Sequence, residues 1–296
     1  MIKKKWIAVA KYPIALLILY FVLRQADWHA IVGYAQNIPL VILLLVFALF
    51  TVAQCLSAAR MNLYYRKVGK PLHWWYNVQL YYVGLVYNIL LPGGIGGDAY
   101  KIYLLKRQKD YPVGEGVRIQ LATRGNGLLV LLLSAYAMLP FIDLPLSRPQ
   151  VLLLVVGLVV VTVAGYVVAS RLLLKDIARI EWSALPYSVG VQGLNVLCMT
   201  LLWANLTQDG YLAEYILLFQ LAAIAGMIPI TIGGLGIREL TFFYGAQWIS
   251  HISGNSVDGE LGVVISLLMF AITVMSAVIG LRWLHSIGKM NPCGPD

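Results

Sequence analysis

The sequence carries little charge. Of its 296 residues only 12% are Asp, Glu, Lys or Arg, whereas 60% are hydrophobic. Soluble domains carry roughly 25% charged residues, so the composition excludes a chain built from ordinary soluble domains. Length alone would suggest two domains of common size. Because the apolar residues take up that length, we expect a single transmembrane domain over residues 1–296 instead.

Cysteine and histidine are scarce as well. The three cysteines form no CxxC and no Cys/His spacing, so neither a disulfide framework nor a metal site is expected. The four histidines are scattered near the ends of apolar runs, where an interfacial position is the simple interpretation. The sequence therefore predicts no metal and no cofactor.

Enzyme signatures are also missing. The sequence has no GxxxxGK[ST] phosphate loop, no GxSxG and no HExxH, and its glycine-rich segments do not follow a β-strand. We therefore do not expect an enzyme. The net charge of +9 belongs to no separate basic domain, so nucleic acid is not an expected partner. Attraction to anionic lipid head groups explains the excess better.

Long apolar runs are what the sequence does contain. Residues 38–57 and 150–170 each approach ~20 residues without a charge, which is the length that crosses a bilayer as a helix. We predict an all-α polytopic membrane protein with about eight transmembrane helices and two shorter helices. The predicted spans are 6–24, 38–58, 74–91, 114–139, 150–170, 184–206, 211–228 and 260–284, and the shorter helices are 94–107 and 234–250.

The distribution of lysine and arginine predicts the orientation. With both termini in the cytoplasm, every basic residue except Arg24, Arg148 and Arg238 lies on the cytoplasmic side or flanks the membrane there. Such a bias is what the positive-inside rule requires.

This assignment holds only if two pairs of helices do not cross completely. Residues 74–91 must enter from the cytoplasm and 94–107 must return to it, while 211–228 must enter from outside and 234–250 must return there. The charge bias therefore predicts two oppositely oriented re-entrant helical hairpins.

The tips of these hairpins carry one pattern twice. Residues 91–101 read LPGGIGGDAYK and residues 228–238 read IPITIGGLGIR. The matched pairs are Pro92 with Pro229, Ile95 with Ile232, Gly96 with Gly233, Gly97 with Gly234 and Lys101 with Arg238. The two copies define an inverted repeat, with halves at roughly 38–139 and 184–284. Inverted repeats with broken helices are a common plan of alternating-access transporters.

Each tip has the chemistry of an anion site. Proline ends the incoming helix, glycines permit the tight turn, and the first amides of the outgoing helix lack helical partners. A helix N-terminus attracts anions, and Lys101 and Arg238 add a full positive charge about one turn further on. The predicted guest is a phosphate or a similar anion. Close helix packing through glycine is the alternative interpretation.

Five ionisable side chains lie at or near the predicted membrane depth: Asp98, Lys101, Arg124, Arg238 and Glu239. Such groups are costly in a membrane and are usually functional or paired. Pairing of Asp98 with Lys101, or cross-repeat pairing of Asp98 with Arg238 or Lys101 with Glu239, would serve structure alone. Contact with a ligand or a coupling ion is the other interpretation, and both stay open.

These residues carry a family resemblance. The stretch NILLPGGIGGDAYKIYLLKR, from Asn88 to Arg107, resembles the Asn-x-x-x-Pro-Gly…Gly-Asp-x-x-Arg block of the lysylphosphatidylglycerol synthase transmembrane-region family, also called flippase-like. The stretch IPITIGGLGIRE, from Ile228 to Glu239, resembles that family's Pro-x-x-x-Gly-Gly-x-Gly-x-Arg-Glu block. The two blocks together are fairly specific, and the resemblance covers nearly the whole chain.

The resemblance implies lipid translocation in a bacterial or archaeal cytoplasmic (inner) membrane. In the aminoacyl-phosphatidylglycerol enzymes this domain flips the product lipid, and relatives without the synthase domain are linked to glycolipid, polyprenyl-linked or hopanoid-type pathways. Lys101 stands where the family has arginine, which keeps the charge but loses bidentate geometry. Only Arg124 remains of the family's Glu-Arg-x-x-Asp stretch. Without a soluble aminoacyltransferase domain in these 296 residues, lysyl transfer is not expected.

Three hypotheses follow for the function. The first is a flippase for an anionic phospholipid or a polyprenyl-linked or glycolipid. The second is a membrane-embedded transferase that uses a polyprenyl-phosphate donor, with Asp98 as its carboxylate. The third is a lipid-binding scaffold for a biosynthetic enzyme partner. The predicted substrate-binding residues are Asn88, Pro92, Gly93, Gly94, Gly96, Gly97, Asp98, Lys101, Arg124, Pro229, Gly233, Gly234, Gly236, Arg238 and Glu239.

Overall fold

The computed structural model describes residues 33, 38–69, 71–91, 94–207, 210–228 and 234–289. The predicted first span, 6–24, lies outside these ranges, as do four predicted site residues, Pro92, Gly93, Pro229 and Gly233. Both chain termini, which we predicted to be cytoplasmic, lie outside them too. Every other predicted helix has a counterpart in the structure.

The described part of the chain is all α-helical, as predicted. Its α-helices are α3 (Leu40–Lys67), α4 (Trp74–Leu90), α5 (Gly96–Lys109), α6 (Val113–Met138), α7 (Arg148–Leu174), α8 (Glu181–Leu206), α9 (Leu212–Gly226), α10 (Ile237–Ser253) and α11 (Gly259–Leu281). Short 3-10 turns are η1 (Leu139–Phe141), η2 (Lys175–Ile180) and η3 (Ile287–Lys289).

Five of the described helices are long and apolar enough to cross a membrane. They are Leu40–Lys67, Val113–Phe141, Arg148–Leu174, Ile177–Leu206 and Gly259–Leu281. The remaining four helices have 17, 14, 15 and 17 residues. At 1.5 Å per residue, 17 residues reach roughly 25 Å, which is short of the ~30 Å hydrocarbon core. Helix length therefore supports five complete crossings among the described residues.

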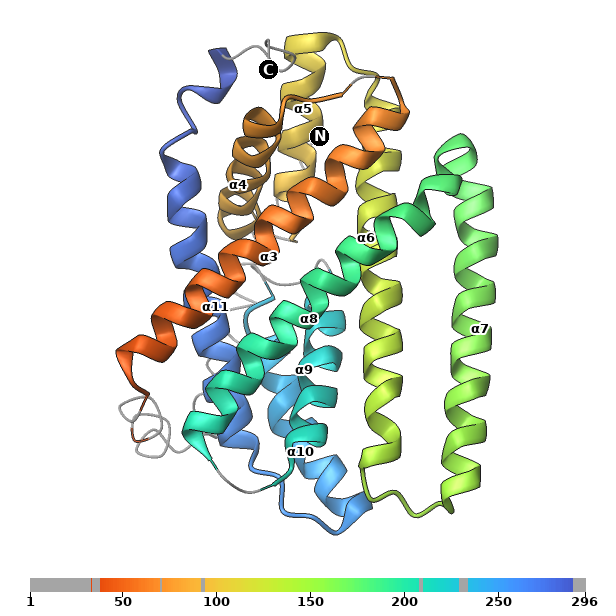
Figure 1. Cartoon of the computed structure of the whole chain (residues 1–296). Helices are drawn as coiled ribbons and strands as arrows, with labels where there is room; N and C mark the ends of the chain where they lie inside the picture. The colour runs from red at the N-terminus through yellow and green to blue at the C-terminus, as the bar shows by residue number, and fades with distance from the viewer. Residues whose placement is uncertain are drawn as a thin grey trace, which may run out of the picture.

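The four shorter helices form two antiparallel pairs, because α4 packs against α5 and α9 packs against α10. In Figure 1 the α4–α5 pair occupies the half of the molecule in which α3 and α7 end, and the α9–α10 pair occupies the opposite half. Helices α4 and α9 both end near the middle of the molecule, while α3 and α8 cross it obliquely (Figure 1). The two pairs thus approach each other end to end.

Glycines bring the helices of this arrangement into close contact. A Cβ atom at Gly97 would lie 1.9 Å from the carbonyl oxygen of Gly84, so α4 and α5 touch through backbone. A Cβ at Gly280 of α11 would lie 2.5 Å from the carbonyl oxygen of Tyr82 in α4. These two glycines therefore allow close helix packing. For Gly97 this agrees with the alternative interpretation of the glycines at the first tip.

The apolar core is divided into two parts, one around each helix pair. The part around α4 and α5 includes Tyr64, Tyr65, Leu80, Leu105 and Ile119. The part around α9 and α10 includes Met199, Leu202, Tyr215, Leu218 and Phe242. Buried polar side chains from α3, α8 and α9 lie between them, namely Gln54, Ser57, Ser188, Gln192 and Gln220. The middle of the molecule is therefore polar.

Candidate functional site

Two adjoining cavities, of about 330 and about 240 Å³, lie in this polar middle layer. Every α-helix of the described chain except α7 contributes a lining residue. The residues that line both cavities are Ser57, Arg60, Tyr81, Leu85, Gly127, Leu131 and Met227. Because so much wall is shared, the two cavities form one space, here called the central chamber.

The first tip places an ion cluster at one side of the central chamber. The Asp98 carboxylate lies 3.2 Å from Lys101 Nζ and 2.6 Å from Arg124 Nε. Arg124 also donates to the carbonyl oxygen of Gly94 at 2.5 Å. Lys101 is 4% exposed, and its ammonium lies 4.7 Å from the centre of the Tyr81 ring. Asp98 is thus paired within its own repeat and with α6, and not with Arg238.

The amide of Gly97 has a partner inside the protein. It donates a 2.9 Å hydrogen bond to Asn88 Oδ1, so Asn88 caps the first turn of α5 from across the helix pair. Gly96 and Gly97 are both buried. The sequence analysis predicted that these amides face a ligand. In this structure the Gly97 amide is bonded to Asn88 instead, and the groups of the first tip that attract an anion most strongly are the cations Lys101 and Arg124.

The second tip is held by Glu239. Gly234 and Gly236 both have φ of 86°, a left-handed conformation that glycine adopts without strain. The Glu239 carboxylate accepts from the Gly236 amide at 2.6 Å and from Ser266 Oγ of α11 at 2.7 Å. Glu239 is fully buried. It therefore anchors the start of α10, and the predicted pair of Lys101 with Glu239 does not form.

Replacing Glu239 with alanine is expected to destabilise the protein without changing which lipids it binds. The change leaves the buried Gly236 amide and Ser266 hydroxyl without their acceptor, which costs about 1–3 kcal/mol. The effect is measured as the unfolding temperature in detergent. Unfolding is detected by the reaction of the Cys198 thiol, which is buried in the folded protein, with a labelling reagent. Glu115→Ala, at the start of α6, is the control. An unfolding temperature equal to that of the wild type would refute the anchoring role.

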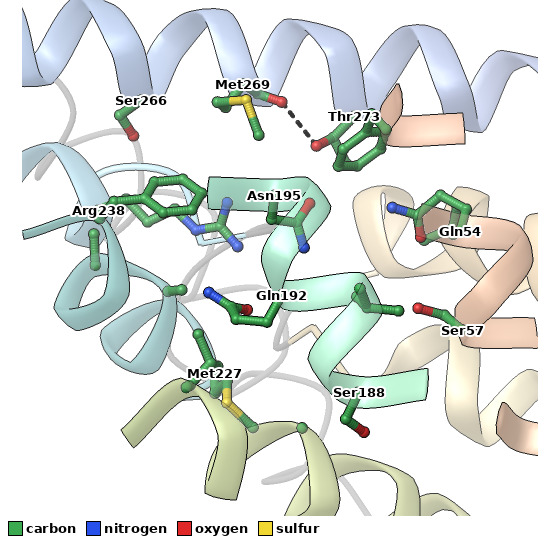
Figure 2. Close-up of a pocket in the computed structure, with 18 of the residues that line it drawn as sticks. Gln54, Ser57, Ser188, Gln192, Asn195, Met227, Arg238, Ser266, Met269 and Thr273 are labelled. Carbon is green, nitrogen blue, oxygen red and sulfur yellow. Dashed lines mark hydrogen bonds between the residues drawn. The ribbon is translucent and has the colours of Figure 1, made fainter. Parts of the chain in front are cut away.

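Arg238 lies at the other side of the central chamber. Its side chain runs between two glycines, since a Cβ at Gly226 would be 2.7 Å and one at Gly234 2.8 Å from its Nε atom. That Nε atom is buried and has no hydrogen-bond partner among the described residues. In Figure 2 the guanidinium points into the chamber beside Asn195 and Gln192 of α8. A buried cation in this position favours an incoming anion.

Arg60 is the chamber residue that sequence reasoning missed. The sequence places it in a loop after a span that ends at residue 58, whereas α3 continues to Lys67. Arg60 lines both parts of the chamber and donates to Ser188 Oγ at 2.6 Å. The available signal was the spacing of Gln54, Ser57 and Arg60, which puts three polar groups on one face of an apolar helix.

The charge of the chamber is strongly unbalanced. Among its described lining residues the cations are Arg60, Lys101, Arg124 and Arg238, and the single carboxylate is that of Asp98. The remaining wall includes apolar side chains such as Phe50, Leu131 and Phe219. A molecule with an anionic group next to an apolar body matches both kinds of surface.

The helices define a multi-pass α-helical membrane protein. The outer helix α7 supports this class, because its Leu153, Val161 and Leu172 side chains are each at least 71% exposed and an apolar surrounding suits such a surface. The family model described as lysylphosphatidylglycerol synthase TM region matches residues 7–185, and the chain belongs to this family. The second tip lies beyond the matched residues. No curated protein matches the chain.

Proposed function

We propose that the protein is a lipid translocase of a bacterial or archaeal cytoplasmic membrane, and that the central chamber holds the anionic head group of its substrate. The observation that carries this proposal is the excess of four cations over one carboxylate among the described lining residues of a chamber between two oppositely placed helix pairs. The substrate class is an anionic phospholipid or a polyprenyl-linked or glycolipid. A biosynthetic enzyme that supplies such a lipid is the matching kind of partner.

In this proposal the α4–α5 and α9–α10 pairs are re-entrant hairpins that enter from opposite faces of the membrane. Their short helices support it, as does the position of the ends of α4 and α9 in the middle of the molecule (Figure 1). The repeated tip sequences supply the symmetry that alternating access uses. Each hairpin would open the chamber to its own side in turn.

Basic residues support the orientation with the ends of α3 and α7 in the cytoplasm. The C-terminal ends of α3, α5 and α7 lie at the top of Figure 1. The last turns of these helices and the following turn η2 contain Arg66, Lys67, Arg107, Arg171 and Arg179. The opposite end carries the acidic residues Asp258 and Glu260 at the start of α11. The positive-inside rule then assigns the upper end to the cytoplasm.

The state of Asp98 favours transport over the transferase alternative. Both of its carboxylate oxygens are engaged, one by Lys101 and the other by Arg124. A carboxylate that is held by two cations is a weak base and a weak nucleophile. The transferase hypothesis rested on Asp98 as the only suitable carboxylate, so this pairing removes its main support. We therefore propose that the protein is not an enzyme.

Arg238→Gln is the sharpest test of the proposed function. Arg238 has no ion pair with a described carboxylate, so its removal leaves no carboxylate unpaired. We expect the initial flipping rate of fluorescent phosphatidylglycerol in proteoliposomes to fall about tenfold or more, which corresponds to an increase of ~1.4 kcal/mol in the activation free energy of flipping. Accessibility of the fluorophore to a membrane-impermeant reductant measures the rate.

The matched control is Arg118→Gln, an arginine on α6 that lies outside the central chamber and lines a separate cavity. This variant is expected to flip the lipid at the wild-type rate. A fluorescent phosphatidylcholine serves as the second control and is expected to move more slowly in wild-type protein. If Arg238→Gln and wild type move phosphatidylglycerol equally fast, the chamber is not the head-group site.

A further inference from the structure

A buried carboxylate lies outside the central chamber, at the first residue of α8. Glu181 is 2% exposed. Its Oε2 atom accepts from the Tyr166 hydroxyl of α7 and from Asn126 Nδ2 of α6, the latter at 2.8 Å. Its Oε1 atom is buried and has no hydrogen-bond partner among the described residues. The Tyr64 hydroxyl of α3 lies close to this carboxylate. A proton on Oε1 can therefore be accommodated, because a hydroxyl oxygen accepts a hydrogen bond as well as donating one.

Hydrogen bonds connect this carboxylate to the central chamber. Asn126 donates to Glu181, and its own Oδ1 accepts from the Ser188 hydroxyl. The Ser188 oxygen in turn accepts from Arg60 Nη1 at 2.6 Å. A continuous row of carboxylate, amide, hydroxyl and guanidinium therefore runs from the start of α8 to a lining residue of the chamber.

Glu181 also faces a separate cavity of about 580 Å³ at the basic end of the molecule. The rim of this cavity is formed by Arg171 at the end of α7 and Arg179 of η2, which are both exposed. From the other elements packed around Glu181, α3 presents Arg60 and Tyr64, α7 presents Tyr166, and α6 presents the uncharged Asn126. The cavity gives solvent protons a route to the carboxylate.

We propose that Glu181 is a proton-binding site, and that its protonation raises the affinity of the central chamber for an anionic head group. The ionised carboxylate is joined to Arg60 through Asn126 and Ser188, so its negative charge offsets part of the positive charge of Arg60. A proton on Oε1 removes that negative charge, so the full positive charge of Arg60 becomes available to a ligand in the chamber. By linkage, the bound anion favours proton uptake by the same factor. The identity of the anion rests on the proposed function.

This coupling makes the occupancy of the chamber by the anion and the occupancy of Glu181 by a proton rise and fall together. The proton enters from the cavity at the basic end and resides on Glu181 while the anion occupies the chamber. When the anion leaves, Arg60 again favours an ionised Glu181, and the proton is released.

The first experiment needs no lipid. Infrared difference spectra of the purified wild-type protein, recorded on acidification, are expected to contain the carbonyl band of a protonated carboxylic acid that Glu181→Gln lacks. Glu214→Gln is the matched control, since Glu214 is a buried carboxylate of α9 that accepts from Asn255 at 3.1 Å. If wild type and Glu181→Gln give the same carboxylic-acid bands, Glu181 binds no proton and the inference is overturned.

The second experiment measures the coupling. Binding of short-chain phosphatidylglycerol to wild type is expected to tighten about tenfold between about pH 8.0 and about pH 5.5, while Glu181→Gln binds equally tightly at both. Ser188→Ala keeps Glu181 intact but interrupts the row of hydrogen bonds, so it is expected to retain the infrared band and to show a smaller pH effect. The Glu214→Gln control is expected to behave as wild type.

The outcomes separate this inference from the proposed function. If phosphatidylglycerol binds with a pH dependence that Glu181→Gln leaves unchanged, the coupling is overturned while the head-group site stands. If no variant binds the lipid at either pH, the proposed function fails, and the infrared arm alone still decides whether Glu181 takes up a proton.

Discussion

Replacing Gly97 with alanine is expected to prevent stable packing of the α4–α5 pair. The added Cβ would lie 1.9 Å from the backbone oxygen of Gly84 and 2.9 Å from Asn88 Oδ1, and backbone cannot move aside as a flexible side chain can. Overpacking typically costs about 1–3 kcal/mol, and a contact with backbone that cannot move aside belongs to the upper end of this range. The measurements are the yield of monodisperse protein in detergent and the thermal exposure of Cys198.

Gly165→Ala is the matched control for this prediction. Gly165 lies in the interior of α7, and a Cβ there meets no atom within 4 Å. Alanine is the better helix former by roughly 1 kcal/mol, so this variant is expected to be as stable as wild type or more stable. If Gly97→Ala is equally stable, α4 and α5 do not touch through their glycines.

Asp98→Asn is also expected to reduce stability strongly. It leaves Lys101 and Arg124 without the carboxylate that holds them at 3.2 and 2.6 Å. Loss of one member of a buried ion cluster costs about 3–5 kcal/mol, because the remaining charges stay buried without compensation. Thermal unfolding in detergent measures the loss.

The double variant Asp98→Asn with Arg124→Gln tests whether the loss arises from unpaired charge. Removal of Arg124 is expected to restore part of the stability, since fewer cations then remain unpaired. Added phosphatidylglycerol should also stabilise Asp98→Asn more than wild type. If Asp98→Asn unfolds at the wild-type temperature, the ion cluster does not form. A product assay on the same variant tests the transferase alternative directly.

Local features of the sequence predicted the helices and the two tips. Proline and glycine act on the backbone of their own segment, so the breaks after residues 91 and 228 are visible without knowledge of the fold. Apolar runs likewise predicted the long helices, and the structure confirms them to within a few residues at most ends. The exception is α3, which extends nine residues beyond the predicted end at residue 58.

The partners of the buried charges could not be predicted from the sequence. Arg60 bonds to Ser188 and Asn126 to Glu181, contacts between residues 128 and 55 positions apart that depend on how α3, α6 and α8 pack. Arg60 and Glu181 were both assigned to loops, because an apolar run marks the hydrophobic part of a helix and not its full length. The suggested ion pairs of Asp98 with Arg238 and of Lys101 with Glu239 were wrong, because pairing between distant helices also depends on how those helices pack.

The two tips share a sequence pattern but differ in how their cations are compensated. Lys101 has Asp98 beside it, whereas Glu239, the carboxylate next to Arg238, is turned away to the Gly236 amide and Ser266. Asp98 is shared by Lys101 and Arg124, so a phosphate in the chamber meets ion-paired cations at the first tip and, at the second, an arginine without an ion pair to a described carboxylate. Two tips with similar sequences therefore form two chemically different binding surfaces, which makes the chamber asymmetric between its two sides.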